Sequence, residues 1–346
     1  MLTKKQVREI KEHLEKAQNP IFFFDNDPDG LCSFLLLQRY IGRGKGVPIK
    51  SFPEMNAEYF RKVRELNADY IFILDKPIVS KEFLDEVKNF NIPVVWIDHH
   101  EVQIEIPDFV YYYNTTLNRL KKNEPVTYLC YKITKRKEDL WLGVVGCVFD
   151  RYVPDFYSKF CKEYPDLSIK SKDAFDIFYK SQIGKIVKMF CFSLKDRISN
   201  VVKMIKFLTV VKTPYEVLEE GNKNHEMHMR FKQIQKKYEK LLGKAKALAS
   251  NDKILFFQYA GDLSISADLS NELSYLYPEK IIIVAYIIGI KANISVRGKK
   301  IRETILKAIE GLEGATAGGH ENAVGSQMRV EYLKTFKEKV EELERY

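Results

Sequence analysis

The sequence predicts an α/β fold in which a parallel-sheet domain is joined by a helical connector to a smaller α/β domain. Short apolar runs alternate with helical patterns up to about residue 150 and again after residue 251, and a lysine-rich helical stretch separates these two regions. Runs that are apolar on both faces and separated by helices are typical of buried parallel strands. We therefore predict three parts, residues 1–155, 156–250 and 251–346.

In the first part, three short apolar runs are the predicted strands. They cover residues 20–24, 70–74 and 93–97. Residues 31–40 and 80–90 have the spacing of helices that connect such strands. A further apolar stretch, residues 140–149, fits a helix or a strand equally well by its periodicity.

The other two parts differ in their pattern. The middle part is predicted to be helical, and its helices cover residues 174–192, 201–211 and 222–249. The last part alternates again, with predicted strands at residues 253–258, 280–286 and 292–297 and predicted helices at residues 266–275 and 301–310. A charged helix over residues 327–346 is predicted to close the chain.

The composition is that of a globular protein with a basic surface. Hydrophobic residues make up 45% of the 346 residues and charged residues 30%, and the net charge is +9. A surplus of positive charge suits a polyanionic substrate such as nucleic acid, although many proteins are basic without binding one. The longest apolar run, residues 281–290, is about half of the ~20 residues that span a bilayer, so we expect no membrane role and a cytoplasmic location. The cysteines lack CxxC pairing and are expected to be buried apolar residues.

Acidic and histidine side chains follow each predicted strand of the first part at the point where the strand ends. These residues are Asp25, Asp27, Asp75, Asp98, His99 and His100. In an open α/β sheet, ligands bind beyond the carboxyl ends of the strands. Carboxylates packed so closely repel one another unless a cation neutralises them. Carboxylates with imidazole suit two divalent ions such as Mn²⁺ or Mg²⁺ better than they suit a thiolate-type zinc site.

Each of these features alone has a simpler explanation. The Asp-x-Asp-x-Asp-Gly segment at residues 25–30 could be a surface turn or a calcium loop, but Leu36 stands where a calcium-binding EF-hand loop requires glutamate. Asp75 could be a helix N-cap, a position that favours aspartate. Adjacent histidines are commonly ordinary surface or half-buried residues. Their common placement at strand ends favours a metal site over these alternatives.

These residues resemble the motifs of a known family. Asp98-His99-His100 after an apolar strand, with the segment DNDPDG at residues 25–30 upstream, resembles the DHH phosphoesterase superfamily. Asp75 is similar to the second motif of that superfamily, and Asp150, which ends the apolar stretch, is similar to the fourth. Several branches carry a histidine shortly before the first aspartate, whereas here that stretch is apolar.

The last part resembles the DHHA1 domain that accompanies the DHH domain. Gly318-Gly319-His320 is similar to its glycine-glycine-histidine signature, and Arg297 ends the strand upstream of it. The resemblance implies that Arg297 and His320 clamp phosphate oxygens of the substrate. It also implies that Gly318 and Gly319 let the backbone approach a phosphate closely, although an ordinary turn would equally use two glycines.

The resemblance also implies roles for the residues of the first part. Asp25 and Asp150 would hold one metal ion, Asp27 and His99 the other, and Asp75 would bridge both. Three further residues would support catalysis. Asp98 would orient the pair, His100 would face the scissile phosphate, and Asp29 would act through water or from behind the metal ligands. Two metal ions ~4 Å apart would supply a hydroxide and stabilise charge on the phosphate.

The basic charge, the long helical connector and the DNDPDG segment most resemble the archaeal RecJ-like exonucleases. The expected activity is therefore metal-dependent hydrolysis of single-stranded DNA or RNA to mononucleotides. One alternative is a hydrolase of short oligonucleotides or cyclic dinucleotides, and another is a replication or repair scaffold with weak catalysis. Replication or repair proteins could also bind the helical connector beside the nucleic-acid substrate.

Overall fold

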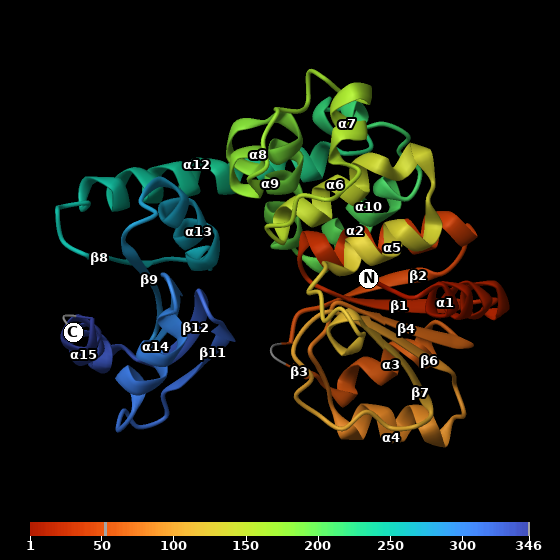
Figure 1. Ribbon diagram of the computed structural model, residues 1–346, viewed down its shortest axis with the longest axis horizontal. Helices are drawn as coiled ribbons and strands as arrows, with labels where there is room; N and C mark the ends of the chain where they lie inside the picture. Colours follow the sequence, from red (N-terminus) through yellow and green to blue (C-terminus); the bar gives the residue numbers. More distant parts are fainter. Residues whose placement is uncertain (52–53, 345–346) are drawn as a thin grey trace. The chain divides into compact units, whose positions relative to one another are not determined.

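The computed structural model describes residues 1–51 and 54–344. The chain divides into two compact units, Met1–Phe231 and Lys232–Tyr346. The first unit holds a five-stranded sheet and the helical section, and the second holds another five-stranded sheet (Figure 1). This architecture confirms the predicted fold class. The division of the chain at residues 155 and 250 stays a prediction.

The sheet of the first unit is parallel throughout, with strand order β2-β1-β4-β6-β7. Its strands are β1 (Pro20–Asp25), β2 (Lys45–Ile49), β4 (Tyr70–Leu74), β6 (Val94–Asp98) and β7 (Val110–Asn114). The chain runs from β1 outward to β2, and then returns to the other side of β1 to form β4. The strand order therefore reverses between β1 and β4, and ligands of open α/β sheets bind at such a reversal.

Both faces of this sheet are buried, as the continuous apolar runs predict. Alternate side chains such as Phe23 and Trp96 form a core with α3 (Phe60–Glu65) and α4 (Lys81–Asn89) on one face. On the other face the ring of Phe24 stacks on Phe34, 5.2 Å between centroids. Figure 1 shows α3 and α4 on one side of the sheet and α2 and α5 on the other.

Helices cover the second face and continue into the helical section. They are α1 (Lys4–Lys16), α2 (Pro28–Ile41), α5 (Val126–Thr134), α6 (Leu140–Phe149), α7 (Tyr157–Glu163), α8 (Ala174–Lys180), α9 (Gln182–Leu194), α10 (Ile198–Leu208), α11 (Pro214–Leu218) and α12 (His225–Ala247). The apolar stretch that sequence periodicity left open is thus the helix α6. The helix predicted over residues 174–192 is two helices, because Ser181 leaves the helical conformation and caps α9.

The second unit is a mixed sheet with helices on both faces, in the strand order β11-β12-β10-β9-β8. Its strands are β8 (Ile254–Ala260), β9 (Ile281–Ile288), β10 (Lys291–Arg297), β11 (Thr316–His320) and β12 (Ala323–Arg329), and its further helices are α13 (Ser266–Leu276), α14 (Ile301–Ile309) and α15 (Leu333–Leu343). Only β8 and β9 among these neighbours run parallel. Residues such as Ile294 pack against α14 and α15, whereas Ser295, on the opposite face, bonds Ser266 of α13.

The predicted helix over residues 327–346 is wrong in its first third. Gln327, Met328 and Arg329 belong to strand β12, and the helix α15 begins at Leu333. Buried and exposed residues alternate along β12, as in a strand. The sequence does not show this alternation clearly, because a buried position holds Ser326 and the exposed positions beside it hold Gly325 and Gln327. The last two residues of the predicted helix lie outside the described residues. Over the part of the chain that is described, no helix combines the length and apolar character needed to cross a lipid bilayer.

Candidate metal centre

The carboxyl ends of three neighbouring strands deliver the predicted acids to one edge of the sheet. Asp25 is the last residue of β1, Asp75 follows β4 directly, and Asp98 is the last residue of β6. Because β1, β4 and β6 are adjacent and parallel, these side chains start from one row of the sheet. The row includes the reversal between β1 and β4, the point at which ligands of open α/β sheets bind.

The loop after β1 is shaped by the start of helix α2. Asp27 is the N-cap of this helix, and its side chain accepts a hydrogen bond of 2.9 Å from the backbone N–H of Gly30. Pro28 occupies the first turn, a position that suits its missing N–H. Gly30 must lack a side chain, because a Cβ there would lie 2.4 Å from the carbonyl oxygen of Asp25. The DNDPDG segment is therefore a tight strand-to-helix turn rather than a surface loop.

Asp75 lies in an unusual backbone conformation. Its φ of 60° is in the left-handed region, which costs free energy for residues other than glycine, least so for aspartate and asparagine. The backbone N–H of Asp75 donates to the carbonyl of Ile97 at 3.0 Å, so the turn is held by the neighbouring strand. The side chain is buried, and among the described residues no donor makes a hydrogen bond of good geometry to its Oδ1.

His99 lies between two of the predicted metal-binding carboxylates. Its Nε2 lies 3.3 Å from Oδ1 of Asp75, and its Nδ1 lies 3.7 Å from Oδ2 of Asp150. Nδ1 also lies 2.6 Å from Oδ1 of Asn123. When Nδ1 donates its proton to Asn123, Nε2 carries a lone pair that faces a carboxylate oxygen. These two atoms repel each other unless a proton or a metal ion lies between them.

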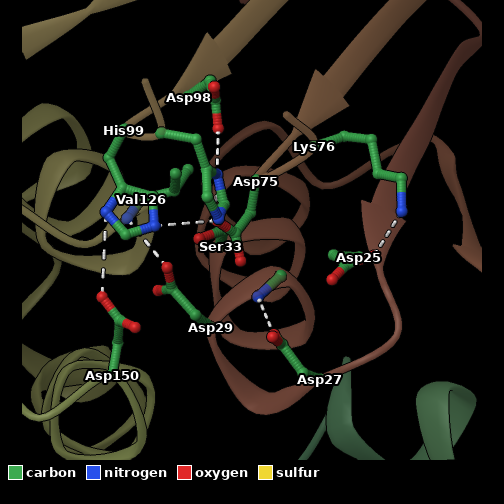
Figure 2. A network of polar contacts seen from close by, with 12 residues as sticks. Asp25, Asp27, Asp29, Ser33, Asp75, Lys76, Asp98, His99, Val126 and Asp150 are labelled. Carbon is green, nitrogen blue, oxygen red and sulfur yellow. Dashed lines mark hydrogen bonds and ion pairs between the residues drawn. The ribbon is translucent and has the colours of Figure 1, made fainter. Parts of the chain in front are cut away.

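Asp150 and Asp29 complete the surroundings of His99. Asp150 caps the end of α6, and it forms with Asp29 and His99 a group whose ligand atoms all lie within 4.8 Å of one another. Asp75, His99 and His100 form a second group of this kind. Figure 2 shows the carboxylates of Asp29, Asp75 and Asp150 around the imidazole of His99.

Asp29 has a structural role that the sequence did not indicate. Its two carboxylate oxygens accept hydrogen bonds from the backbone N–H groups of Val126 and Thr127, at 3.0 and 2.8 Å. These N–H groups open helix α5, so Asp29 caps that helix from a different part of the chain. The hydroxyl of Thr127 donates in turn to the backbone carbonyl of Asp29 at 2.8 Å. Asp29 thus joins the DNDPDG turn to α5.

Asp98 and His100 form a pair beside this cluster. Nδ1 of His100 lies 2.8 Å from Oδ1 of Asp98, and the hydroxyl of Tyr112 donates to the other oxygen of Asp98 at 3.3 Å. Asp98 is almost completely buried, whereas the His100 side chain is 24% exposed. Asn114 donates to the backbone carbonyl of His100 at 2.8 Å and holds the segment against β7. Asp98 therefore holds the ring of His100 through Nδ1, whereas the role of Asp98 in orienting the pair stays a prediction.

The acids of the cluster disturb one another's ionisation. Burial, together with neighbouring carboxylates, raises the pKa of Asp27 and of Asp75 well above the usual range. Partial burial raises the pKa of Asp150 to about 6. Burial opposes a charged His99, but Asp75 and Asp150 outweigh it, and the pKa of His99 is well above its usual range. A bound cation would relieve this mutual repulsion.

Lys76 is the main residue of the site that the sequence reasoning missed. Its Nζ lies 2.9 Å from Oδ1 of Asp25, and none of its side chain is exposed. A lysine beside Asp75 gives no signal in the sequence, because its burial arises from the packing of distant segments. Asn123, whose Oδ1 lies 2.6 Å from Nδ1 of His99, was also missed, because it is 24 residues away in the chain.

The residues predicted to bind substrate lie in the second unit. Arg297 of β10 and His320 of β11 are both paired with Ala323 of the strand between them, so they lie in one row of the sheet. Nε of Arg297 donates to Asn271 at 2.6 Å. Gly318 and Gly319 lie in strand β11 rather than in a turn. Gly319 has a φ of 137°, and a Cβ there would lie 2.4 Å from the carbonyl oxygen of Ala323.

The donor set fits a divalent metal ion. The buried Oδ1 of Asp75 and the facing Nε2 of His99 are an oxygen and an imidazole nitrogen without a cation between them. Mn²⁺ accepts this combination of ligands. Asp75 and His99, with His100 in the same group of close ligand atoms, would hold the ion, whereas Asp25 and Asp27 fall outside both such groups found among the described residues. The assignment of each predicted ligand to one of two ions stays a prediction.

Comparison with known proteins agrees with this geometry. The model of the DHH family, N-terminal domain, matches residues 21–140. No curated protein sequence matches the chain. A RecJ in complex with Mn²⁺ from Thermus thermophilus has a similar structure, with a TM-score of 0.70 and 17% identity over 99% of this chain and 54% of that one. This chain thus spans about half the length of that RecJ.

Two further structures have the same fold. An exonuclease RecJ bound to manganese gives a TM-score of 0.67 and 18% identity over 98% of this chain and 93% of that one. The DHH domain of a member of a ribosomal-protein family gives a TM-score of 0.70 and 16% identity, over 98% and 89%. At such low identities the structural likeness shows the fold alone, and the family model covers only the first part of the chain. The sequence match thus extends over residues 21–140, about a third of the chain, which are similar to the N-terminal domain of the DHH family.

Proposed function

We propose that the chain is a metal-dependent phosphodiesterase that removes mononucleotides from single-stranded DNA or RNA, as a RecJ-like exonuclease. The observation that carries this proposal is the approach of Nε2 of His99 to Oδ1 of Asp75, 3.3 Å, with Asp150 on the other side of the ring. A buried carboxylate, an imidazole and a second carboxylate at the reversal of an α/β sheet are the parts of a hydrolytic metal centre.

The side chains around the centre have separable tasks. When bound, a divalent ion supplies a hydroxide near neutral pH and neutralises charge on a phosphate. Asp98 holds the ring of His100 through Nδ1, and His100 would donate a proton to the leaving oxygen. The partly exposed ring of His100 is accessible to a substrate, whereas Asp98 is not.

The charge of the chain favours a polyanionic substrate. The net charge of +9 supports binding of a nucleic-acid backbone rather than of a neutral ester. Arg297 and His320, in one row of the second sheet, would bind backbone phosphates. Binding of replication or repair proteins through the helical section is part of this proposal, but it is independent of the catalytic one.

The test is a hydrolysis assay with Mn²⁺ and single strands of about 20 nucleotides, long enough to cover typical single-strand binding sites. DNA and RNA strands labelled at either end distinguish the sugar preference and the direction of digestion. We expect Mn²⁺-dependent release of mononucleotides by the wild-type protein and none by Asp75→Asn. The absence of Mn²⁺-dependent hydrolysis with every strand would contradict the proposal.

The same assay separates long from short substrates. Dinucleotides and cyclic dinucleotides are supplied at equal concentration beside the longer strands. Faster hydrolysis of the short substrates would replace the exonuclease proposal with that of a short-oligonucleotide hydrolase. Arg297→Ala should weaken binding of long strands more than that of dinucleotides, because a single strand meets more phosphate contacts than a dinucleotide does.

A further inference from the structure

A lysine is built into the metal centre beside Asp25. Nζ of Lys76 lies 2.9 Å from Oδ1 of Asp25 and donates to the backbone carbonyl of Ser51 at 2.8 Å. The Lys76 side chain is fully buried, and the Asp25 side chain is 27% exposed. A buried ammonium is stable only when it is paired and hydrogen-bonded, and Asp25 and the carbonyl of Ser51 supply these partners to Lys76.

The position of Lys76 is set by the surrounding fold. The indole N–H of Trp96 donates to the backbone carbonyl of Lys76 at 2.9 Å. Two residues further on, β5 (Ile78–Val79) pairs with β3 (Glu54–Met55) and links the segment of Lys76 to that of Ser51. The backbone of Lys76 is therefore fixed by Trp96 and this small sheet, and its buried ammonium lies between Asp25 and the carbonyl of Ser51.

We propose that the Lys76 ammonium takes the place of one of the two divalent ions that the DHH resemblance implies, so that the centre binds a single ion beside Asp75 and His99. This inference rests on the proposed function for the role of that ion, but it concerns the number of ions and the task of Asp25. Figure 2 shows the Lys76–Asp25 pair apart from the carboxylates that surround His99.

The reason is electrostatic. A divalent ion bound to the oxygen that pairs with Lys76 would lie close to a positive charge that cannot move away, because the whole lysine side chain is buried. The strand before Asp25 offers no further ligand, since its residues Ile21, Phe22, Phe23 and Phe24 are apolar and fully buried. Asp25 is thus committed to the lysine, whereas Oδ1 of Asp75 remains available to an ion.

This arrangement gives Lys76 a task in the proposed reaction. The ammonium supplies a fixed positive charge at the edge of the sheet whether or not an ion is bound. It therefore holds the Asp25 carboxylate in place and stabilises part of the negative charge of a phosphate substrate beside it. Lys76 is a positioning and charge-balancing residue in this view, and Asp25 is its partner rather than a metal ligand.

The test counts ions on the full chain without substrate. Equilibrium dialysis against Mn²⁺ gives the stoichiometry, and electron paramagnetic resonance separates isolated Mn²⁺ from a spin-coupled pair. We expect one Mn²⁺ per chain for the wild type, two for Lys76→Met, in which Asp25 is released, and none for Asp75→Asn. Two ions with similar affinity in the wild type would overturn the proposal, and so would a folded Lys76→Met that still binds one.

Asp25→Asn gives a second measurement that does not depend on the folding of Lys76→Met. If Asp25 only pairs with Lys76, this variant binds one Mn²⁺ with a dissociation constant within about threefold of the wild type, because no metal ligand has been removed. A loss of affinity of about tenfold or more would make Asp25 a metal ligand and overturn the proposal. One bound ion without any phosphodiester hydrolysis would instead refute the proposed function and leave the ion count intact.

Discussion

Nε2 of His99 lies 3.3 Å from Oδ1 of Asp75, and both side chains are at most 5% exposed. The carboxylate comes from the end of β4 and the imidazole from the end of the neighbouring strand β6. Burial and nearby acids raise the pKa of Asp75, so its charge costs stability in the absence of a cation. The charge of Asp75 therefore destabilises the metal-free protein, and the same charge raises the affinity of the site for a divalent ion.

Asp75→Asn should therefore have opposite effects on stability and on metal binding. Because the pKa of Asp75 is raised in the folded protein, the contribution of Asp75 to stability is complete below its unfolded pKa. That contribution is lost as the pH rises through its folded pKa. The substitution removes that loss, so the melting temperature without metal should rise at neutral pH. Activity should fall by more than ~100-fold, the upper end for residues that merely support ligands. A stabilisation by Mn²⁺ as large as in the wild type would contradict the assignment of Asp75 as a ligand.

Asp98 and His100 should act as one unit. Because Asp98 accepts from Nδ1 of His100, each single substitution removes the same function, and the double variant should be no worse than the more impaired single one. We expect Asp98→Asn to lower kcat by about 10–100-fold, the range for residues that orient an imidazole. Tyr112→Phe, which removes the longer contact to Asp98, is the matched control and should have a smaller effect. Additive losses in the double variant would show that the two residues act separately.

Asp29→Ala should destabilise the first unit. Two buried backbone N–H groups of α5 would lose their charged acceptor, which costs about 3 kcal/mol in the free energy of unfolding. Asp173, the exposed N-cap of α8, is the matched control, and Asp173→Ala should cost about 1 kcal/mol. Urea unfolding followed by tryptophan fluorescence measures both, because both tryptophans lie in this unit. Equal losses would mean that Asp29 is an ordinary cap.

Gly30→Ala should move Asp25 and destabilise the turn. The new Cβ would lie 2.4 Å from the carbonyl oxygen of Asp25, a contact that only a shift of the backbone can relieve. We expect a loss of about 1–3 kcal/mol, as for other overpacked positions. Gly221→Ala is the control, since its Cβ would meet just one atom, at 3.9 Å. That variant should be neutral or more stable by up to ~1 kcal/mol. Two variants of equal stability would refute the close approach at Gly30.

The sequence predicted those candidate site residues that directly follow an apolar strand. It did not predict the residues that only tertiary packing brings to the site. Apolar runs on both faces revealed β1, β4 and β6, and the next residues were acids or histidines. Lys76 and Asn123 gave no such signal. Nothing in the sequence distinguishes Lys76 from the many other lysines or Asn123 from an ordinary polar residue, and only the tertiary fold brings them to Asp25 and His99. Strand β7 was missed because an exposed tyrosine interrupts its apolar pattern.

His13 should make the stability of the first unit depend on pH. Burial, with Lys16 nearby, lowers the pKa of His13 from 6.5, while Glu12 and Glu9 oppose the change. The ring lies against Tyr111, and its Nδ1 is 2.5 Å from the hydroxyl of Tyr70.

A lowered folded pKa means that this contribution to stability is complete above the unfolded pKa and is lost as the pH falls through the folded value. Urea unfolding of the wild type and of His13→Gln, compared from about pH 8 to about pH 5, isolates this residue because the other groups titrate alike in both proteins. The advantage of the wild type over His13→Gln should shrink as the pH falls below 6.5. A difference that stays constant over this range would show that His13 ionises equally in the folded and unfolded chain.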